Sequence, residues 1–218
     1  MANDERALGL ILRVRPLTET SLIVHWLTPD AGRLATVAKA ARRANSPFRG
    51  KLDLLYIAEF SLARSRRSEL HTLREVSLRE THEFLRHDLS RLRQAAHAVA
   101  LLEQTTETET PVPTLFQLAV GWLAELAHAA PGPLMVFAFE FKLLLDLGLM
   151  PDLDSSALSS GAREVARRLA GDEWPALRQL RITEGQTREL KNFLHGFLIH
   201  HLGRIPKGRA TALDQSEE

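Results

Sequence analysis

The chain has 218 residues, of which 44% are hydrophobic and 25% are charged, so it is long enough for one large or two small globular domains. It contains no cysteine, which excludes disulfides, thiolate nucleophiles and cysteine-based zinc sites. The start, MANDERALGL, lacks the apolar segment of a secretory signal. The longest apolar run, residues 134–150, is interrupted by Glu140, Lys142 and Asp146. We therefore expect no membrane span and a cytoplasmic location.

Positive charge is concentrated in the first part of the chain. Residues 1–80 hold 14 basic and 9 acidic residues, a net charge of +5, whereas residues 81–218 hold 14 basic and 18 acidic residues, a net charge of −4. Such asymmetry between two halves suggests a polyanionic partner for the first half. A solvated basic surface without a partner is the alternative.

Short alternating segments dominate residues 9–80. The segment LILRVR predicts one face with Leu10, Leu12 and Val14 and an opposite face with Ile11, Arg13 and Arg15. Four further segments show the same period, at residues 22–27, 33–40, 54–63 and 70–78. Five short strands in about 70 residues favour a small antiparallel barrel of the OB type, with an SH3-like barrel as the alternative.

The period becomes helical after residue 82. Apolar residues at helical spacing predict helices at about 88–104, 114–130, 134–147, 161–170 and 184–202. The polar tail at 203–218 is expected to fray. The predicted fold class is therefore α+β, with a five-stranded OB-type barrel over residues 1–80 and an all-α domain over residues 81–218.

Signals for enzymatic chemistry are weak. The sequence contains no HExxH, GxxxxGK[ST], GxSxG or GxGxxG motif. His200 and His201 are adjacent on a predicted helix, so their side chains diverge by about 100° and do not easily share a metal. We predict no catalytic residue, no cofactor and no metal ligand.

Basic residues gather in the predicted loops of the barrel. The connection between the third and fourth strands begins with KAARRANSPFRG, and the turn between the fourth and fifth strands contains RSRR. Guanidinium and ammonium groups on irregular, accessible backbone suit phosphate contact. The predicted nucleic-acid-binding residues are Arg33, Lys39, Arg42, Arg43, Arg49, Lys51, Arg64, Arg66 and Arg67.

Aromatic residues and the C-terminal region offer further contacts to nucleic acid. Phe48, with Trp26 and Tyr56, offers rings for base stacking. Near the end of the chain, Arg204, Lys207 and Arg209 either extend the basic surface or cap the last helix.

The ordered set of segments resembles the RecO family of bacterial recombination mediators. The resemblance rests on "ETSLIV", "TPDAGRLATVAKAARR", "ELHTLREVSL", "FEFKLLLDLGLMPDL" and "FLIHHLGRIPKGR", which cover nearly the whole chain in order. It implies an N-terminal OB-fold, a helical C-terminal domain and a place of action in the bacterial cytoplasm at the nucleoid. It further implies binding of single- and double-stranded DNA, annealing of complementary strands, and work with RecR and single-strand-binding protein to load RecA.

Two departures from the family pattern stand out. Ser156 and Ser159 occupy the region where many members carry the first Cys-x-x-Cys pair of a zinc site, and serine hydroxyls are poor zinc ligands. The loop at 154–161 must then be held by packing or be mobile. Ala40 stands where the family often has glycine, so the turn there is expected to differ.

The helical domain is expected to serve as a platform for proteins. An apolar groove edged by cations such as Arg168, Arg178 and Lys191 would suit the acidic, hydrophobic C-terminal tail of single-strand-binding protein. Two other functions share the same sequence features: a protein-interaction adaptor with incidental nucleic-acid binding, and an RNA-binding accessory factor.

Overall fold

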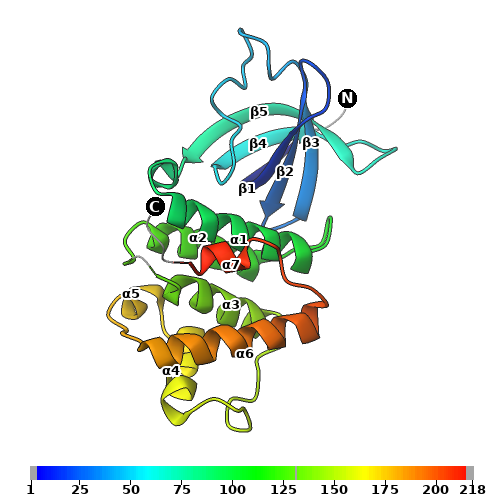
Figure 1. Cartoon of the computed structure of the whole chain (residues 1–218). Coiled ribbons are helices and arrows are strands. Elements are labelled where there is room, and N and C mark those ends of the chain that lie inside the picture. Colours follow the sequence, from blue (N-terminus) through cyan, green and yellow to red (C-terminus); the bar gives the residue numbers. More distant parts are fainter. Residues whose placement is uncertain (1–3, 131, 215–218) are drawn as a thin grey trace. The chain divides into compact units, whose positions relative to one another are not determined.

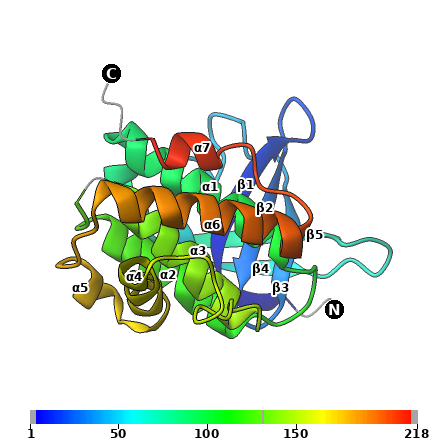
Figure 2. The ribbon, with the colours of Figure 1, turned by 60° about the horizontal axis from the view of Figure 1, so that its bottom comes forward.

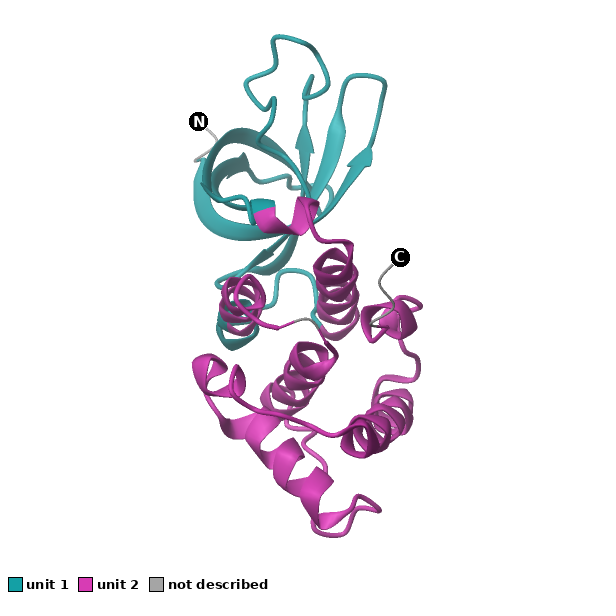
Figure 3. Ribbon diagram, turned by 60° about the vertical axis from the view of Figure 1, so that its left-hand side comes forward, with its two compact units in different colours: residues 1–83, 106–117 teal, residues 84–105, 118–218 magenta. Residues whose placement is uncertain are grey.

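The computed structural model describes residues 4–130 and 132–214. These residues belong to two compact units (Figure 3). One unit combines Met1–Glu83 with Thr106–Gln117, and the other combines Phe84–Thr105 with Leu118–Glu218. The first break therefore lies close to the predicted boundary at residue 80. The return of Thr106–Gln117 to the first unit has no counterpart in the predicted division.

The first unit is built around a closed five-stranded barrel (Figure 1). Its strands follow the order β1-β2-β3-β5-β4, and every neighbouring pair is antiparallel except β3 and β5, which are parallel. The predicted OB-type barrel is confirmed, and the SH3-like alternative is set aside. The strands are β1 (Glu5–Pro16), β2 (Leu22–Thr28), β3 (Gly32–Ala38), β4 (Ile57–Ala63) and β5 (Leu70–Glu80).

The predicted alternation of β1 is wrong at its centre. The pairing of β1 with β2 shifts register between Ile11 and Arg13, which is the mark of a β-bulge. One extra residue reverses the side-chain faces beyond it. Ile11 and Val14, predicted on opposite faces, consequently both contact the barrel core.

An aromatic pair fills the barrel. The rings of Trp26 and Phe60 stack with centroids 4.1 Å apart, and the buried Trp26 Nε1 donates to Thr36 Oγ1 at 2.9 Å. Gly9 lies against this pair, because a Cβ at that position would come within 2.9 Å of a Phe60 ring carbon and 3.1 Å of a Trp26 ring carbon. A glycine is therefore needed here for close packing rather than for backbone freedom.

The segment at 106–117 is tied to the turn between β2 and β3. The Arg33 N–H donates to the Glu107 carbonyl at 3.2 Å, and the Glu109 N–H donates back to the Arg33 carbonyl at 3.1 Å. The Val112 N–H donates to the Pro29 carbonyl at 3.0 Å. These main-chain bonds explain why the segment belongs to the barrel unit.

Seven α-helices and one short 3₁₀-helix occupy the described residues. Five of the α-helices match predicted ones, whereas α5, α7 and the 3₁₀-helix were not predicted because each spans only four residues. The helices are the 3₁₀-helix at Glu83–Arg86, α1 (Leu89–Thr105), α2 (Pro113–Leu126), α3 (Leu134–Asp146), α4 (Ser160–Gly171), α5 (Trp174–Leu177), α6 (Glu184–Leu202) and α7 (Arg209–Ala212).

Helix α3 is the buried centre of the helical unit, and it contacts α1, α4 and α6 (Figure 2). Its Glu140 is completely buried. The Arg209 guanidinium, from α7, donates to both Glu140 oxygens at 2.7 and 2.8 Å, and His97 Nε2, from α1, lies 2.8 Å from Oε1. A buried carboxylate of this kind is tolerated only with such partners.

The Glu140 ion pair changes the expected behaviour of the C-terminal segment. Burial acts to raise the pKa of the Glu140 carboxyl, but the hydrogen bonds and charges of Arg209 and His97 outweigh it and lower the pKa. Residues 203–214 are not a frayed tail, since α7 packs beside α1. Residues 215–218 of the predicted tail lie outside the described residues.

Replacing Glu140 with glutamine should destabilise the protein strongly, because Arg209 would keep its buried charge without a carboxylate. We expect a loss of about 3–5 kcal/mol in the free energy of unfolding. Glu164→Gln, which weakens the exposed pair with Arg167, should cost less than about 1 kcal/mol. Chemical denaturation of both variants measures the difference. Equal losses in the two variants would show that the buried pair is not important for stability.

Candidate nucleic-acid interface

The connection between β3 and β4 is a series of tight turns. Main-chain N–H groups of Arg43, Ser46, Arg49 and Lys51 each donate to the carbonyl three residues earlier, at 3.0–3.2 Å. Ala40 opens the connection with φ of 56°, in the left-handed region that favours glycine. The turn therefore takes a conformation suited to glycine even though alanine stands there, at a cost of about 1 kcal/mol.

Phe48 anchors the middle of the connection. Its side chain is 7% exposed and belongs to the barrel core, with Ala41 and Leu52 packed against the same core. The Phe48 N–H also donates to Ser46 Oγ at 3.2 Å. The anchor fixes the connection while the residues on either side stay exposed.

A second set of contacts fixes the connection to the turn between β1 and β2. The Arg42 N–H donates to the Thr20 carbonyl at 2.9 Å, and Arg42 Nη1 donates to the Thr18 carbonyl at 3.4 Å. The Ala40 N–H lies 3.4 Å from Ser21 Oγ. Two loops distant in sequence are thus joined at one end of the barrel.

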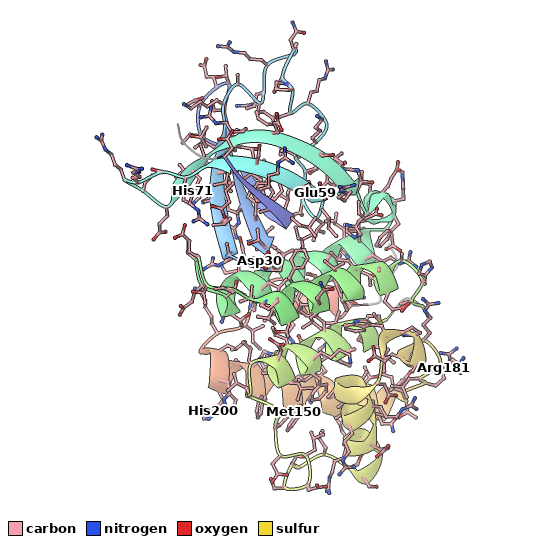
Figure 4. The ribbon with its side chains drawn as sticks, turned by 180° about the vertical axis from the view of Figure 1, so that it is seen from behind. Asp30, Glu59, His71, Met150, Arg181 and His200 are labelled. Carbon is pink, nitrogen blue, oxygen red and sulfur yellow. The ribbon has the colours of Figure 1, made fainter. Side chains whose placement is uncertain are left out.

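Three of the predicted cations of this connection, Arg42, Arg43 and Arg49, come together in space. Lys39, Arg42, Arg43 and Arg49 are exposed, whereas Lys51 is half-buried. Figure 4 shows nitrogen-tipped side chains spreading from this end of the barrel. A cavity of about 390 Å³ opens here, lined by Arg42, Arg43 and Arg49 together with apolar residues of the connection and of β2. We name this feature the arginine cavity.

Two arginines of β1 extend this surface and were not among the predicted site residues. Arg13 pairs in register with His25, and Arg15 pairs with Ile23; both arginines are exposed. Arg15 Nη2 lies 2.9 Å from His25 Nε2. The alternation of LILRVR placed both arginines on the same face as Ile11, and the bulge in β1 separates them from that buried residue.

Arg64, by contrast, is engaged in ion pairs. Its Nε and Nη2 donate to the two carboxylate oxygens of Glu5 at 2.7 and 3.1 Å, and its Nη1 pairs with Glu109. The hydrogen bond from Arg64 lowers the pKa of the Glu5 carboxyl. His71, buried beside them, lies 3.0 Å from the same Glu109 oxygen. Arg64 therefore stabilises the barrel and is a poor candidate for phosphate contact.

The remaining predicted cations of the barrel differ in exposure. Arg66 and Arg67 are exposed at the tip of the turn between β4 and β5. Arg33 is half-buried, and its Nε is buried without a hydrogen-bond partner in the part of the chain that is described. Arg66 and Arg67 remain suitable for phosphate contact, whereas Arg33 is less accessible than predicted.

The predicted stacking residues are not available. Trp26, Phe48 and Tyr56 are at most 7% exposed, and the other aromatic residues described in this unit, Phe60 and Phe116, are also buried. The prediction that bases stack on these aromatic rings is therefore wrong. The physical reason is that a small barrel needs these large rings to fill its core.

The predicted C-terminal cations also differ in exposure. Arg209 is 4% exposed and paired with Glu140, so it is not available to bind DNA. Arg204 and Lys207 are exposed just beyond Gly203, which ends α6 with φ of 74°. Gln104 fixes this turn through its Nε2, which donates to the carbonyls of Leu202 and Arg204 at 3.0 and 2.9 Å.

The loop that replaces the zinc-binding region does not fit a metal. Ser156 Oγ donates to the Leu153 carbonyl at 2.7 Å, while Ser159 Oγ caps α4 and contacts Glu189 at 3.1 Å. Within residues 4–130 and 132–214 no group of three His, Asp or Glu side chains is arranged to hold a metal ion.

Packing, a hydrogen bond and one ion pair hold this loop instead. Leu153 and Leu158 are buried in the helical core. Arg163 Nε donates to the Leu158 carbonyl at 2.8 Å, and Arg167 pairs with Asp154 at 2.5 Å. The expected packing of this loop is therefore observed.

The helical unit contains an apolar groove of about 570 Å³. Its apolar lining includes Leu134, Phe137, Leu180 and Ile182. Its charged lining consists of one acidic residue, Glu184, and four cations: Arg178, Arg181, Arg188 and Lys191. We name this feature the basic-edged groove. Two predicted edge residues, Arg178 and Lys191, line it, whereas Arg168 pairs with Asp172 and does not. Glu125 neutralises Arg178 through an ion pair.

No helix among the described residues is long and apolar enough to cross a membrane.

Comparison with known proteins gives consistent matches. Residues 1–82 match the family described as "Recombination protein O N terminal", and residues 86–161 match "Recombination protein O C terminal". DNA repair protein RecO of Anaeromyxobacter dehalogenans is 30% identical over 232 residues, covering 90% of this chain and 91% of that protein. DNA repair protein RecO of Rhodopirellula baltica is 31% identical over 166 residues, covering 75% of this chain and 60% of that protein.

Removing two exposed arginines should change the salt dependence of binding to a single-stranded oligonucleotide. For Arg42→Ser/Arg43→Ser we expect the slope of log K against log salt to become shallower by about 1.4, because two phosphate contacts are lost. Arg64→Ser should leave the slope unchanged and lower the melting temperature. Fluorescence anisotropy across a salt series, with thermal melts, measures both effects. The assignment is wrong if Arg64→Ser changes the slope as much as the double variant does.

Proposed function

The chain belongs to the RecO family, and on this premise we propose that it is a DNA-binding recombination mediator that works without catalysing a covalent reaction. Family membership supports a role in DNA repair and recombination. The finer proposal is that the protein binds single- and double-stranded DNA and anneals complementary strands. With RecR it would then help to load RecA onto DNA coated by single-strand-binding protein, at the bacterial nucleoid.

One observation carries the DNA-binding proposal: exposed arginines surround a cavity at one end of an OB-type barrel. Annealing requires two phosphate backbones to approach each other, and their mutual repulsion opposes this. Lys39, Arg42, Arg43 and Arg49 would lower that repulsion when they bind phosphates and release counterions. Contacts of this type carry no base information, so binding should depend only weakly on sequence.

Annealing of two complementary oligonucleotides is the direct test. Wild type should speed annealing, and Arg42→Glu/Arg43→Glu should abolish the acceleration because it makes the surface repel phosphates. If about six phosphates are neutralised, single-strand affinity of the wild type should also fall roughly 300-fold between 50 and 200 mM salt. A fluorescence-quenching assay follows the annealing rate.

The matched control is Arg74→Glu/Arg79→Glu. This variant changes the net charge by the same amount on the same barrel, at residues of β5 that pair with Asp4 and Glu59. It should retain most of the activity. Equal loss in both double variants would mean that total charge, and not the arginine cavity, governs annealing. Failure of the wild type to anneal would favour the adaptor function instead.

We propose that the basic-edged groove binds the acidic, hydrophobic C-terminal tail of single-strand-binding protein. The apolar lining suits hydrophobic side chains, and Arg181, Arg188 and Lys191 at the edge suit carboxylates. Figure 4 labels Arg181 on the outer side of the helical unit. This groove is also the feature that favours the adaptor as a second candidate function.

Charge reversal at the groove edge should weaken binding of an acidic, hydrophobic peptide. For Arg181→Glu/Lys191→Glu we expect at least a tenfold loss of affinity, equivalent to about 1.4 kcal/mol. Lys207→Glu, at an exposed position outside the lining of the groove, should change affinity less than twofold. Titration with a labelled peptide measures both. Equal effects of the two variants would argue against the groove as the binding site.

A further inference from the structure

The arginine cavity has two chemically different parts. Leu22, Ala41 and Leu52, which are half-buried, contribute the accessible apolar lining beside the buried Phe48 ring, and Arg42, Arg43 and Arg49 contribute cations. Phosphate contact alone would require only the cations, because a phosphate gains nothing from apolar surface. An occupant that uses both parts would combine a flat, weakly polar body with neighbouring negative charge.

Two of the arginines each make one long hydrogen bond to a main-chain carbonyl of the loops at this end of the barrel. Arg42 Nη1 donates to the Thr18 carbonyl at 3.4 Å, and Arg49 Nη1 donates to the Ala44 carbonyl at 3.3 Å. Each guanidinium has further N–H groups for a ligand. The apolar part is held by packing, since Phe48 is buried and Ala41 and Leu52 pack on the barrel core. Preorganisation of the apolar part lowers the entropic cost of binding.

The cavity is an open depression on the surface of the barrel unit. Its volume of about 390 Å³ lies near the lower end of the range of small-molecule sites, roughly 300–1,000 Å³. A single nucleotide fits this range, whereas a base pair within a duplex does not enter without first leaving the stack. A nucleobase also has the two flat faces that apolar side chains contact well.

We propose that the arginine cavity takes one unpaired nucleobase against its apolar part, while Arg42, Arg43 and Arg49 bind the adjacent phosphates. This inference rests on the proposed DNA-binding function and adds a specific element to it. The barrel unit has no exposed aromatic ring among its described residues, so the cavity supplies the base contact that ring stacking supplies elsewhere. Because the base must be unpaired, the cavity favours single strands over duplex.

An oligonucleotide without bases distinguishes the contribution of the bases to affinity from that of the phosphates. We would measure the affinity of the full chain for a 20-residue single strand and for a strand of equal length and charge whose bases are all missing. Wild type should bind the intact strand five- to tenfold more tightly. Ala41→Leu, which adds volume inside the cavity without changing charge, should remove this difference while leaving the affinity for the abasic strand unchanged.

Two further variants distinguish filling of the cavity from a general effect of the substitution. Ala157→Leu makes the same substitution at an exposed position of the helical unit and should retain the difference. If Ala41→Leu does not fold, as judged by circular dichroism, Ala44→Leu at the exposed edge of the cavity replaces it. Equal binding of both strands by wild type, or a difference that persists in the filled variant, would overturn the inference and leave DNA binding intact. Binding of neither strand would overturn the proposed function itself.

Discussion

Burial of the Phe48 ring is the constraint on which the candidate interface depends. The ring belongs to the core that Trp26 and Phe60 also fill, so its position is set by close packing. Phe48 is buried, and Arg43 and Arg49 on either side of it are exposed. A hydrophobic interaction thus determines where the cations lie, and the loop needs no charged partner of its own to stay in place.

The helical unit depends on a different kind of interaction. Glu140 at the centre of α3 requires the guanidinium of Arg209, and this pair holds the last described helix against the others. Polar contacts recur at the loop of residues 154–161, where Arg163 donates to a main-chain carbonyl, Arg167 pairs with Asp154, and Leu158 is buried. In both places a polar contact accompanies the packing of apolar residues. In the barrel, the packing of Phe48 fixes the connection that carries the cations.

Much of the fold follows from periodicity, because a strand or helix of sufficient length repeats its pattern several times. Examples are the alternating apolar residues at 54–63 and the apolar residues at helical spacing in α6. The β1 bulge was not predictable, because one extra residue does not change the composition of the segment. It nevertheless turns the side chain of Val14 to the opposite face of the strand. Helices α5 and α7 were too short to show a period.

The candidate site was only partly predictable for a related reason. Arg42 and Arg49 lie on irregular backbone rich in turn formers, and the sequence shows both features. Arg64 and Arg209 look similar in the sequence, yet Glu5 and Glu140, their partners, lie 59 and 69 residues away. Whether an arginine is exposed or neutralised depends on such distant pairs, and a single sequence does not reveal them.

The return of Thr106–Gln117 to the barrel has a consequence for how the protein is made. The barrel unit is discontinuous in the chain, because helix α1 is synthesised between its strands and its final segment. At about 5–20 residues per second, several seconds can pass on the ribosome between completion of β5 and emergence of Glu109, the partner of Arg64 and His71. Until then the nascent barrel has all five strands but lacks the segment that pairs with the β2–β3 turn. Its folding is thereby coupled in time to synthesis of the first helix of its neighbour.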